Sequence, residues 1–390
     1  MDGAASPTSR DRRMRRIFRT LLTLGAAALL CATTPASAQI RIGIAGPMTD
    51  TLGPIGLEQR TAVEAAVAAI NAAGGVLGEQ IIVQVADDTS ERAPCSSDER
   101  TRDVANQLAG AGVVFVVGHL CSAASIAAAA VYAAEDIVQI APGAPDPRFT
   151  DNRAGPGTFR LFGRADAQAT TAAALIATRS AGAPVAVVDD QTEYGRNLGG
   201  AVREALDNAA VTLAFNESYL PSSVDLPDLV RRIGLSGAGL VYFAGGAAEA
   251  ARLRLEMTSQ GSTAILFAGD ALADPAFTAV AGDAADGTLF TYPPAPRLSP
   301  AAADVGAAMR AAGTEPAGFA LFAYAAVEIW AAAVAEAGTT NLAPVARAIA
   351  AGTFQTVLGP VTFNADGEAD IVGWVVHEWQ GGAYAPLAAP

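Results

Sequence analysis

Short apolar runs and longer alanine-rich segments alternate along this chain. Each apolar run of about four to six residues predicts a buried strand, and each alanine-rich segment is long enough for a helix. Such alternation predicts right-handed βαβ units, which form a parallel sheet with helices on both faces. The elements predicted first along the chain are strands at Ile40–Ala45, Ile81–Ala86, Val113–Val117 and Ile137–Ala141, a helix at about Gly56–Ala73, and helices between the later strands.

A second series of the same kind follows and predicts a second lobe. Its strands are expected near Val185–Val188, Val211–Ala214, Leu240–Phe243 and Ile265–Ala268, and its helices at about Asp166–Ser180, Tyr194–Asn208 and Ala247–Ser259. The predicted fold class is therefore α/β, with two doubly wound parallel-sheet lobes joined by a hinge. In open parallel sheets ligands bind beyond the carboxyl ends of the strands, so two such lobes would close on a ligand.

A proline-rich break at residues 292–296 separates the second series from further helices at about Pro300–Ala312 and Gly318–Ala337. Those helices need a packing partner, and we expect the first lobe to provide it. The predicted lobes are residues 39–163 with 293–371, and residues 164–292 with 372–390.

The first 38 residues have the features of a cleavable signal peptide. Six arginines precede the apolar run Leu21–Leu30, which ends before an Ala-x-Ala cleavage site at Ala36–Ala38. The apolar run is too short to span a bilayer. We therefore expect a periplasmic protein. The sequence leaves open whether Met14 is the true start and whether export uses the general or the twin-arginine route.

Composition excludes several kinds of chemistry. The chain has no lysine, because all 25 of its Lys and Arg residues are arginine, and its net charge is −14. Lysine-dependent phosphate loops and Schiff bases are thus absent, and so acidic a chain should repel nucleic acid and anionic lipid. Two histidines far apart in sequence offer no metal-binding spacing. No catalytic constellation, metal site or cofactor is expected, which favours a binding protein over an enzyme.

Removal of the leader leaves two cysteines, Cys95 and Cys121. In an oxidising compartment these are expected to form a disulfide, and the alternative is two buried thiols. Ser122 follows directly, where an apolar strand runs into an alanine-rich helix. A serine at a helix N-terminus can hold a carboxylate together with the unpaired backbone amides, or it can simply cap the helix. This segment alone leaves both interpretations open.

The chain resembles type I periplasmic solute-binding proteins of the leucine/isoleucine/valine-binding branch, which feed ABC transporters. The resemblance covers essentially all of residues 40–380. Its most specific motif is Gly118-His119-Leu120-Cys121-Ser122, and it is supported by Gly46-Pro47-Met48-Thr49, Ala68-Ala69-Ile70-Asn71 before Gly74-Gly75-Val76, Tyr194-Gly195 and Leu358-Gly359-Pro360.

The resemblance implies a site for an amino acid. Ser122, with backbone groups of Gly143 and Ala144, would hold the α-carboxylate, and Asp270 would hold the α-ammonium. Tyr194 would line the cleft. The alternatives are that Asp270 is an exposed aspartate capping the segment near Asp274, and that Tyr194 only packs over a helix end. The other expected ligand-site residues are Leu120, Cys121 and Ile55.

Three departures from the family pattern concern the ligand. Pro145 replaces a threonine and so removes a hydroxyl and an N–H, while Ile55 and Gly246 stand where aromatic residues are usual. The expected function is capture of branched-chain or other small apolar amino acids by a monomer that delivers them to an inner-membrane ABC permease. The alternatives are an amide, a urea-like compound or an aromatic acid as ligand, or a role as a ligand-sensing receptor subunit.

Overall fold

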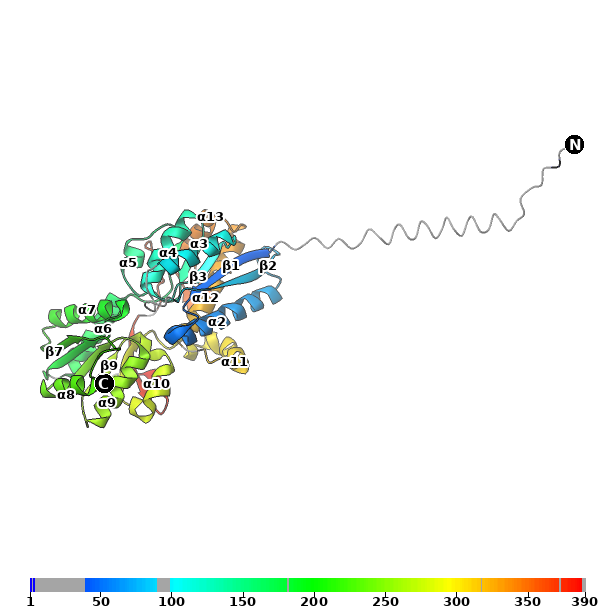
Figure 1. The fold of residues 1–390 in the computed structure, drawn as a ribbon. Helices are drawn as coiled ribbons and strands as arrows, with labels where there is room; N and C mark the ends of the chain where they lie inside the picture. Colours follow the sequence, from blue (N-terminus) through cyan, green and yellow to red (C-terminus); the bar gives the residue numbers. More distant parts are fainter. Residues whose placement is uncertain are drawn as a thin grey trace. The chain divides into compact units, whose positions relative to one another are not determined.

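Two β-sheets form the framework of the protein, and most of their strands are the apolar runs of the sequence (Figure 1). The computed structural model describes residues 39–89, 99–180, 182–316, 318–371 and 373–387, together with residues 1 and 3. The expected leader, apart from those two residues, and Cys95 therefore lie outside the described residues. The residues from Ile40 onward belong to one compact unit.

The first sheet has the strand order β2-β1-β3-β4-β5. Strands β1, β3, β4 and β5 run parallel, and their register pairs Ile44 of β1 with Val117 of β3. The predicted strands agree with these elements within about two residues, except that β5 was not predicted. The bounds are β1 Gln39–Gly46, β2 Gln80–Asp87, β3 Phe115–Gly118, β4 Val138–Ala141 and β5 Thr158–Arg160.

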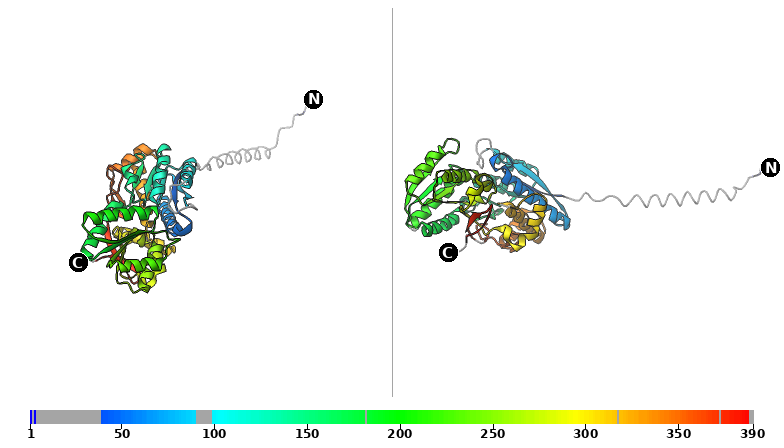
Figure 2. Two further views of the ribbon diagram at one scale, coloured as in Figure 1. Left: turned by 60° about the vertical axis from the view of Figure 1, so that its left-hand side comes forward. Right: turned by 90° about the horizontal axis from the view of Figure 1, so that it is seen from below.

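Helices cover both faces of this sheet because successive strand residues point in opposite directions. Ile44 and Val117 pack in the cluster that contains residues of α2, α12 and α13, whereas Ala45 and Val116 pack against α3 and α4. Figure 2 shows these helices in two further views. Their bounds are α2 Gly53–Ala72, α3 Glu99–Gly110, α4 Ser122–Ala134, α12 Ala320–Ala337 and α13 Leu342–Ala351; the short α5 spans Arg148–Asp151.

The second sheet has the order β14-β13-β10-β9-β8-β6-β7 and is parallel only from β10 to β7. Strands β13 and β14 are antiparallel, which corrects the expectation of a purely parallel sheet. Gly381 and Gly382 connect them, and both have positive φ, which suits a tight hairpin turn. The bounds are β6 Val185–Asp189, β7 Leu213–Ser218, β8 Leu240–Ala244, β9 Ile265–Ala268, β10 Leu289–Tyr292, β13 Val375–Gln380 and β14 Ala383–Pro386.

Helices α6 and α7 pack on one face of the second sheet, and α8 and α9 pack on the other. Helix α8 was not predicted. Strand β7 begins two residues later than expected, because its alternating half-buried pattern belongs to an edge strand rather than to an apolar run. The bounds are α6 Ala165–Arg179, α7 Glu193–Asn208, α8 Leu226–Leu235, α9 Ala247–Ser259, α10 Ala276–Ala281, η2 Asp270–Ala273 and η3 Gly282–Ala285.

The helices after the proline-rich break pack on the first sheet, as expected. Helix α12 lies against α2 and β3, and its Trp330 ring stacks on Phe115 at 5.0 Å. Among the described residues, α12 is the helix long and apolar enough to cross a membrane, but 72% of it is buried in the protein. It is therefore a core helix. The exact lobe boundaries expected from the sequence stay a prediction.

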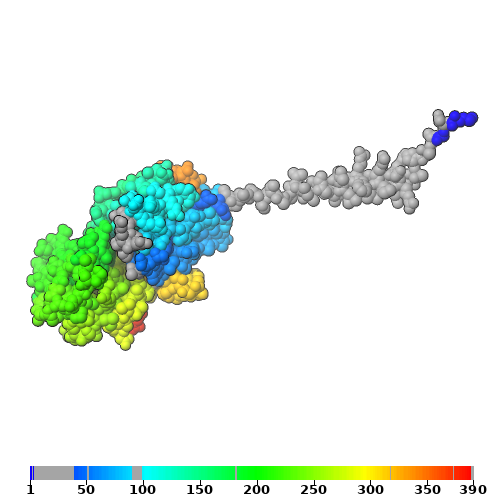
Figure 3. Space-filling model, viewed as in Figure 1, coloured from blue at the N-terminus to red at the C-terminus, as the bar shows by residue number. Residues whose placement is uncertain are grey.

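The helix predicted at residues 300–312 is shorter than expected, because α11 spans Ala303–Ala311 after two 3-10 turns. The surface of α11 adjoins that of α2 in the space-filling view (Figure 3). The negative charge of Glu315, which follows α11, repels that of Glu58 in α2. The remaining elements are η1 Asp50–Leu52, η4 Pro296–Leu298, η5 Pro300–Ala302, β11 Phe354–Thr356 and β12 Gly359–Val361, the last two forming a separate antiparallel pair.

Candidate functional site

Two loops at the carboxyl ends of β3 and β4 carry the candidate residues of the first sheet. The loop after β3 leads through Leu120 and Cys121 into α4, and the loop after β4 contains Gly143 and Ala144. A hydrogen bond of 2.9 Å from the Ala144 N–H to the Leu120 carbonyl joins the two loops. A Cβ atom on residue 143 would lie 2.5 Å from that carbonyl oxygen, so this close approach requires glycine.

Ser122 is the first residue of α4 rather than its N-cap. Cys121 occupies the N-cap position and makes no capping hydrogen bond with its side chain. The Ser122 Oγ atom accepts a hydrogen bond of 3.1 Å from the backbone N–H of Asp146. The hydroxyl proton of Ser122 therefore remains available for another acceptor, beside the unpaired amides of the first helical turn. The interpretation of Ser122 as a simple N-cap was wrong.

Ile55 joins the same group of side chains from α2. It packs with Leu52 and Phe319 against the cluster of Leu120, Cys121 and Ala124. Ile55 and Leu120 therefore lie in one apolar cluster with Cys121, the residue before Ser122, and their role in ligand binding stays a prediction. The expected disulfide between Cys95 and Cys121 stays a prediction, because Cys95 lies outside the described residues.

Tyr194 and Asp270 form the candidate half-site of the second sheet. Tyr194 lies in the first turn of α7, and Asp270 begins η2 after β9. The Tyr194 hydroxyl and the Gln168 side-chain amide each donate a hydrogen bond of 2.8 Å to Asp270 Oδ1. Asp270 is only 3% exposed. The interpretation of Asp270 as an exposed capping residue was therefore wrong; Asp274 accepts the hydrogen bond from the Ala276 N–H instead.

Burial dominates the electrostatics of this half-site. It raises the pKa of Asp270 above its ordinary value, while the hydrogen bonds from Gln168 and Tyr194 oppose that shift. Burial, together with the negative charge of Asp270, raises the pKa of Tyr194, so the tyrosine stays a neutral donor. A buried carboxylate that accepts hydrogen bonds from two neutral side chains, Gln168 and Tyr194, is suited to a positively charged ligand group.

His119, part of the most specific sequence motif, is a buried structural residue that makes hydrogen bonds with two neighbouring side chains. Its Nδ1 atom lies 2.5 Å from Asp88 Oδ2 and its Nε2 atom 3.0 Å from the Tyr132 hydroxyl. The ring is fully buried and both nitrogens are occupied by these partners. His119 thus fixes the loop after β3 by contacts with Asp88, the residue after β2, and with Tyr132 of α4. The part of the chain that the structure describes contains no cluster of three or more His, Cys, Asp and Glu side chains that could hold a metal.

Sequence reasoning missed four polar residues that connect these groups: Gln168, Asp146, Asn197 and Arg160. Gln168 lies inside α6, where no strand end marks it as a candidate. Asp146 is one residue beyond the Gly143–Pro145 segment, and its acidic side chain, close to a strand end, was a signal that could have identified it. Asn197 and Arg160 have no sequence signal of their own.

Two hollows of about 420 and 160 Å³ lie near the connections between the sheets. The larger is lined by the proline-rich segment, including Pro293 and Pro296, and the smaller by Gly163, Glu368 and Trp374 among others. Neither of these two hollows is lined by Ser122 or Asp270.

Two α/β halves, each with polar residues at the carboxyl ends of its strands, define a two-lobed ligand-binding protein. The chain belongs to the periplasmic binding protein family, since the family model described as "Periplasmic binding protein" matches residues 39–383. The expected resemblance to the leucine/isoleucine/valine-binding branch is confirmed by relatives. The protein named Leu/Ile/Val-binding protein homolog 1 of Brucella melitensis biotype 1 is 34% identical over 358 residues, 92% of this chain and 95% of the relative.

Solved structures share the fold at lower identity. The branched-chain amino acid transporter substrate binding protein LivJ from Streptococcus pneumoniae, in complex with isoleucine, has a TM-score of 0.79 at 22% identity, over 90% of this chain and 99% of its own. A solute binding protein of an ABC transporter from Rhodopseudomonas palustris, in complex with p-hydroxybenzoic acid, has a TM-score of 0.78 at 16% identity, over 90% of this chain and 96% of its own.

Proposed function

We propose that this protein is the periplasmic substrate-binding component of an ABC transporter and that it captures branched-chain or other small apolar amino acids. Its family membership and its 34% identity to a Leu/Ile/Val-binding protein homologue support the role in transport. The chemistry of the two half-sites supports the amino acid. The expected cleavable leader, the monomeric state and the Cys95–Cys121 disulfide are parts of the same proposal.

The observation that carries the ligand assignment is the opposite polarity of the two half-sites. The first offers the Ser122 hydroxyl, already an acceptor for the Asp146 N–H, and the N-terminus of α4, which both favour an anion. The second offers the Asp270 carboxylate, stabilised by Tyr194 and Gln168, which favours a cation. A zwitterion such as an α-amino acid satisfies both.

Apolar side chains beside Ser122 favour an apolar ligand side chain. Ile55, Leu120 and Phe319 lie in one cluster at this position and would be removed from water by an aliphatic group. Ala144 and Pro145 contribute no side-chain donor. Binding of the ligand side chain would thus rest on apolar contact, which discriminates weakly between leucine, isoleucine and valine.

An aromatic acid is the second candidate ligand. Pro145 has no N–H to donate to a carboxylate, and Ile55 and Gly246 take less room than aromatic residues would. A benzoate-like compound would use Ser122 and the helix N-terminus and would leave Asp270 without a cationic partner. The burial of Asp270 therefore favours the amino acid over the aromatic acid.

Calorimetric titration of the mature protein, residues 39–390, tests the proposal after bound ligand has been removed by unfolding and refolding. Leucine, isoleucine and valine are expected to bind. In an unfolding measurement, each of them at about a hundred times its dissociation constant should raise the free energy of unfolding by about 2.7 kcal/mol. Binding of benzoate or 4-hydroxybenzoate with no response to any amino acid would overturn the amino-acid assignment and leave the family membership intact.

A further inference from the structure

Asp146 makes hydrogen bonds through both its backbone and its side chain. These bonds connect it to the half-site of Ser122 and to the helix that carries Tyr194. Its N–H donates to Ser122 Oγ at 3.1 Å, and its carbonyl accepts from Arg160 Nη1 at 2.7 Å. Its carboxylate accepts from Arg148 and, at 2.9 Å, from Asn197 Nδ2. The residue is 5% exposed. Asp146 therefore connects the candidate carboxylate-binding serine of the first sheet to a helix of the second.

Asn197 is located on the helix that carries Tyr194. It follows Tyr194 by three residues, so the two side chains lie on the same face of α7. A hydrogen-bonded path consequently runs from Ser122 through Asp146 to Asn197, and one turn of α7 separates Asn197 from the Tyr194–Asp270 pair. The same loop makes a second contact with the helices of the second sheet. The Ala165 N–H at the start of α6 donates a hydrogen bond of 2.9 Å to the Pro145 carbonyl.

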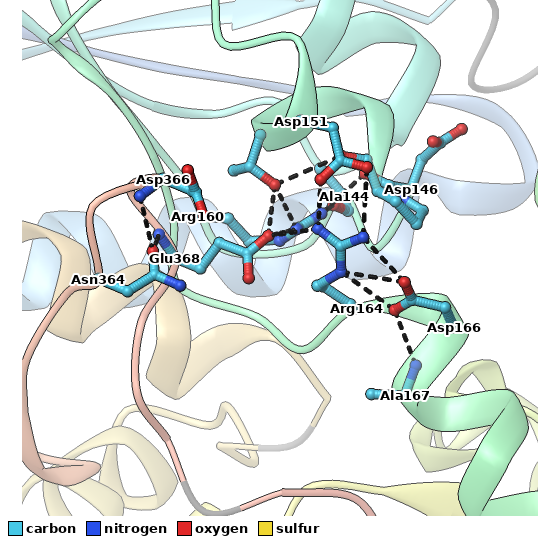
Figure 4. Close-up of polar contacts among 12 residues, drawn as sticks. Ala144, Asp146, Asp151, Arg160, Arg164, Asp166, Ala167, Asn364, Asp366 and Glu368 are labelled. Carbon is cyan, nitrogen blue, oxygen red and sulfur yellow. Dashed lines mark hydrogen bonds and ion pairs between the residues drawn. The ribbon is translucent and has the colours of Figure 1, made fainter.

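Arg160 and Glu368 hold the loop that contains Ala144 and Asp146 (Figure 4). Arg160 is fully buried and donates to the carbonyls of Ala144 and Asp146. Arg160 Nη2 donates to Glu368 Oε1 at 2.5 Å, and Arg164 Nη1 donates to the same oxygen at 2.8 Å. These hydrogen bonds of the buried Arg160 hold the loop on the first sheet, so separation of the two half-sites would break the contacts of the loop with α7 and α6 first.

We propose that Asp146 and Asn197 form a latch that holds the two half-sites together over the ligand and thereby sets the rate of ligand release. The inference rests on the proposed function for its ligand. A donor to a buried carboxylate makes a stronger hydrogen bond than a neutral pair does. The neighbouring Arg148–Glu193 ion pair is exposed at both side chains and contributes little to closure.

Stopped-flow kinetics with leucine test the latch. In Asn197→Ala the dissociation rate should rise about fivefold to tenfold, because the hydrogen bond from Asn197 to the Asp146 carboxylate no longer holds the two half-sites together. Asn197→Asp places a second carboxylate against Asp146 and should release leucine faster still. In the double variant Asp146→Asn with Asn197→Asp, donor and acceptor are exchanged, and the dissociation rate should return toward that of the wild type.

Glu193→Ala is the matched control, because it removes an exposed ion pair that joins α5 to α7 beside the Asp146–Asn197 contact. Its dissociation rate should stay within about twofold of the wild type. Dissociation rates that do not change in Asn197→Ala or in Asn197→Asp would overturn the latch.

Small-angle X-ray scattering of the ligand-free variants separates failure of the latch from failure of the proposed function. Asn197→Asp should increase the radius of gyration, and the double variant should restore it, whatever ligand the protein takes. If the wild type binds no amino acid but the scattering changes as expected, the latch stands and the ligand assignment fails. If the radius is the same in all three proteins, the latch is overturned.

Discussion

The Tyr194 hydroxyl donates a hydrogen bond of 2.8 Å to Oδ1 of Asp270, although 76 residues separate the two in the sequence. The bond joins the first turn of α7 to the segment after β9. Because Asp270 is buried, its carboxylate is stabilised by Tyr194 and Gln168 in place of water. The proposed ammonium-binding group is therefore held in position before any ligand arrives.

Tyr194→Phe removes one of these two donors. Burial already raises the pKa of Asp270, and loss of the tyrosine hydrogen bond should raise it further. The carboxylate would then take up a proton more readily as the pH falls, and a protonated Asp270 attracts an ammonium group weakly. We expect leucine affinity to fall about tenfold at pH 8 and by more at pH 5.5, measured by calorimetry. An equal loss at both pH values would contradict the argument.

Asp270→Asn tests the cation-binding role directly. The substitution keeps the shape of the side chain and removes its charge, so loss of the charge-assisted contact should cost on the order of 2 kcal/mol, or more than tenfold in affinity for leucine, isoleucine and valine. Circular dichroism and the melting temperature serve as controls for folding. Unchanged leucine affinity in a folded variant would rule Asp270 out as the ammonium-binding residue.

Glu58 of α2 should make stability depend on pH. Burial, followed by repulsion from Asp274 and Glu315, raises its pKa from 4.5 to about 7. Between these values the folded protein binds more protons than the unfolded chain, so the free energy of unfolding should fall as the pH rises from about 4.5 to about 7. Glu58→Gln should reduce this slope, measured by urea unfolding at several pH values. Glu64→Gln, on the same helix but at an exposed ion pair with Arg60, is the control and should keep the slope.

Glu368→Gln should destabilise the protein at neutral pH. The substitution leaves the fully buried Arg160 without its carboxylate partner, and breaking a buried ion pair typically costs about 3 to 5 kcal/mol. Burial alone would raise the pKa of Glu368, but hydrogen bonds from Thr150 and Arg164 and the charge of Arg160 bring it below the ordinary value.

The stabilisation by Glu368 should therefore be present above the ordinary pKa of about 4.5 and lost as the pH falls through the lowered value. Urea unfolding should show the difference between wild type and variant shrinking in acid. Asp366→Asn, at an exposed neighbouring position, is the control, with an expected change within about 0.5 kcal/mol. A Glu368→Gln variant as stable as this control would contradict the prediction.

The expected Cys95–Cys121 disulfide can be tested by alkylation of the denatured, unreduced protein followed by mass spectrometry. We expect no added label before reduction and two labels after it. Cys95→Ser should lower the free energy of unfolding by roughly 3 to 4 kcal/mol, because the bridge closes a loop of about 25 residues. It should also weaken leucine binding, since Cys121 directly precedes Ser122. Alkylation of both thiols without reductant would exclude the bridge.

Local sequence patterns determined much of this protein. Runs such as Ile265–Ala268 are apolar throughout because parallel strands are covered on both faces, and the alanine-rich segments between them had to be helices. The strand that runs into a helix at Ser122 identified that residue as a candidate, the motif around Ser122 indicated the family, and the resemblance to the family then implied Ala144 and Asp270. The same local rules missed β5, which has only three residues, and the antiparallel edge formed by β13 and β14, a part of the chain to which no pattern was assigned.

Tertiary structure alone decided how the candidates are connected. That Gln168 and Tyr194 both reach Asp270, and that Asn197 reaches Asp146, depends on which helices pack beside which strands, and no local pattern records that packing. Burial of Asp270 likewise depends on atoms contributed from distant parts of the chain. Hydrophobic periodicity is a property of neighbouring residues and could be read from the sequence, whereas hydrogen bonds and desolvation depend on distances that only the folded chain sets.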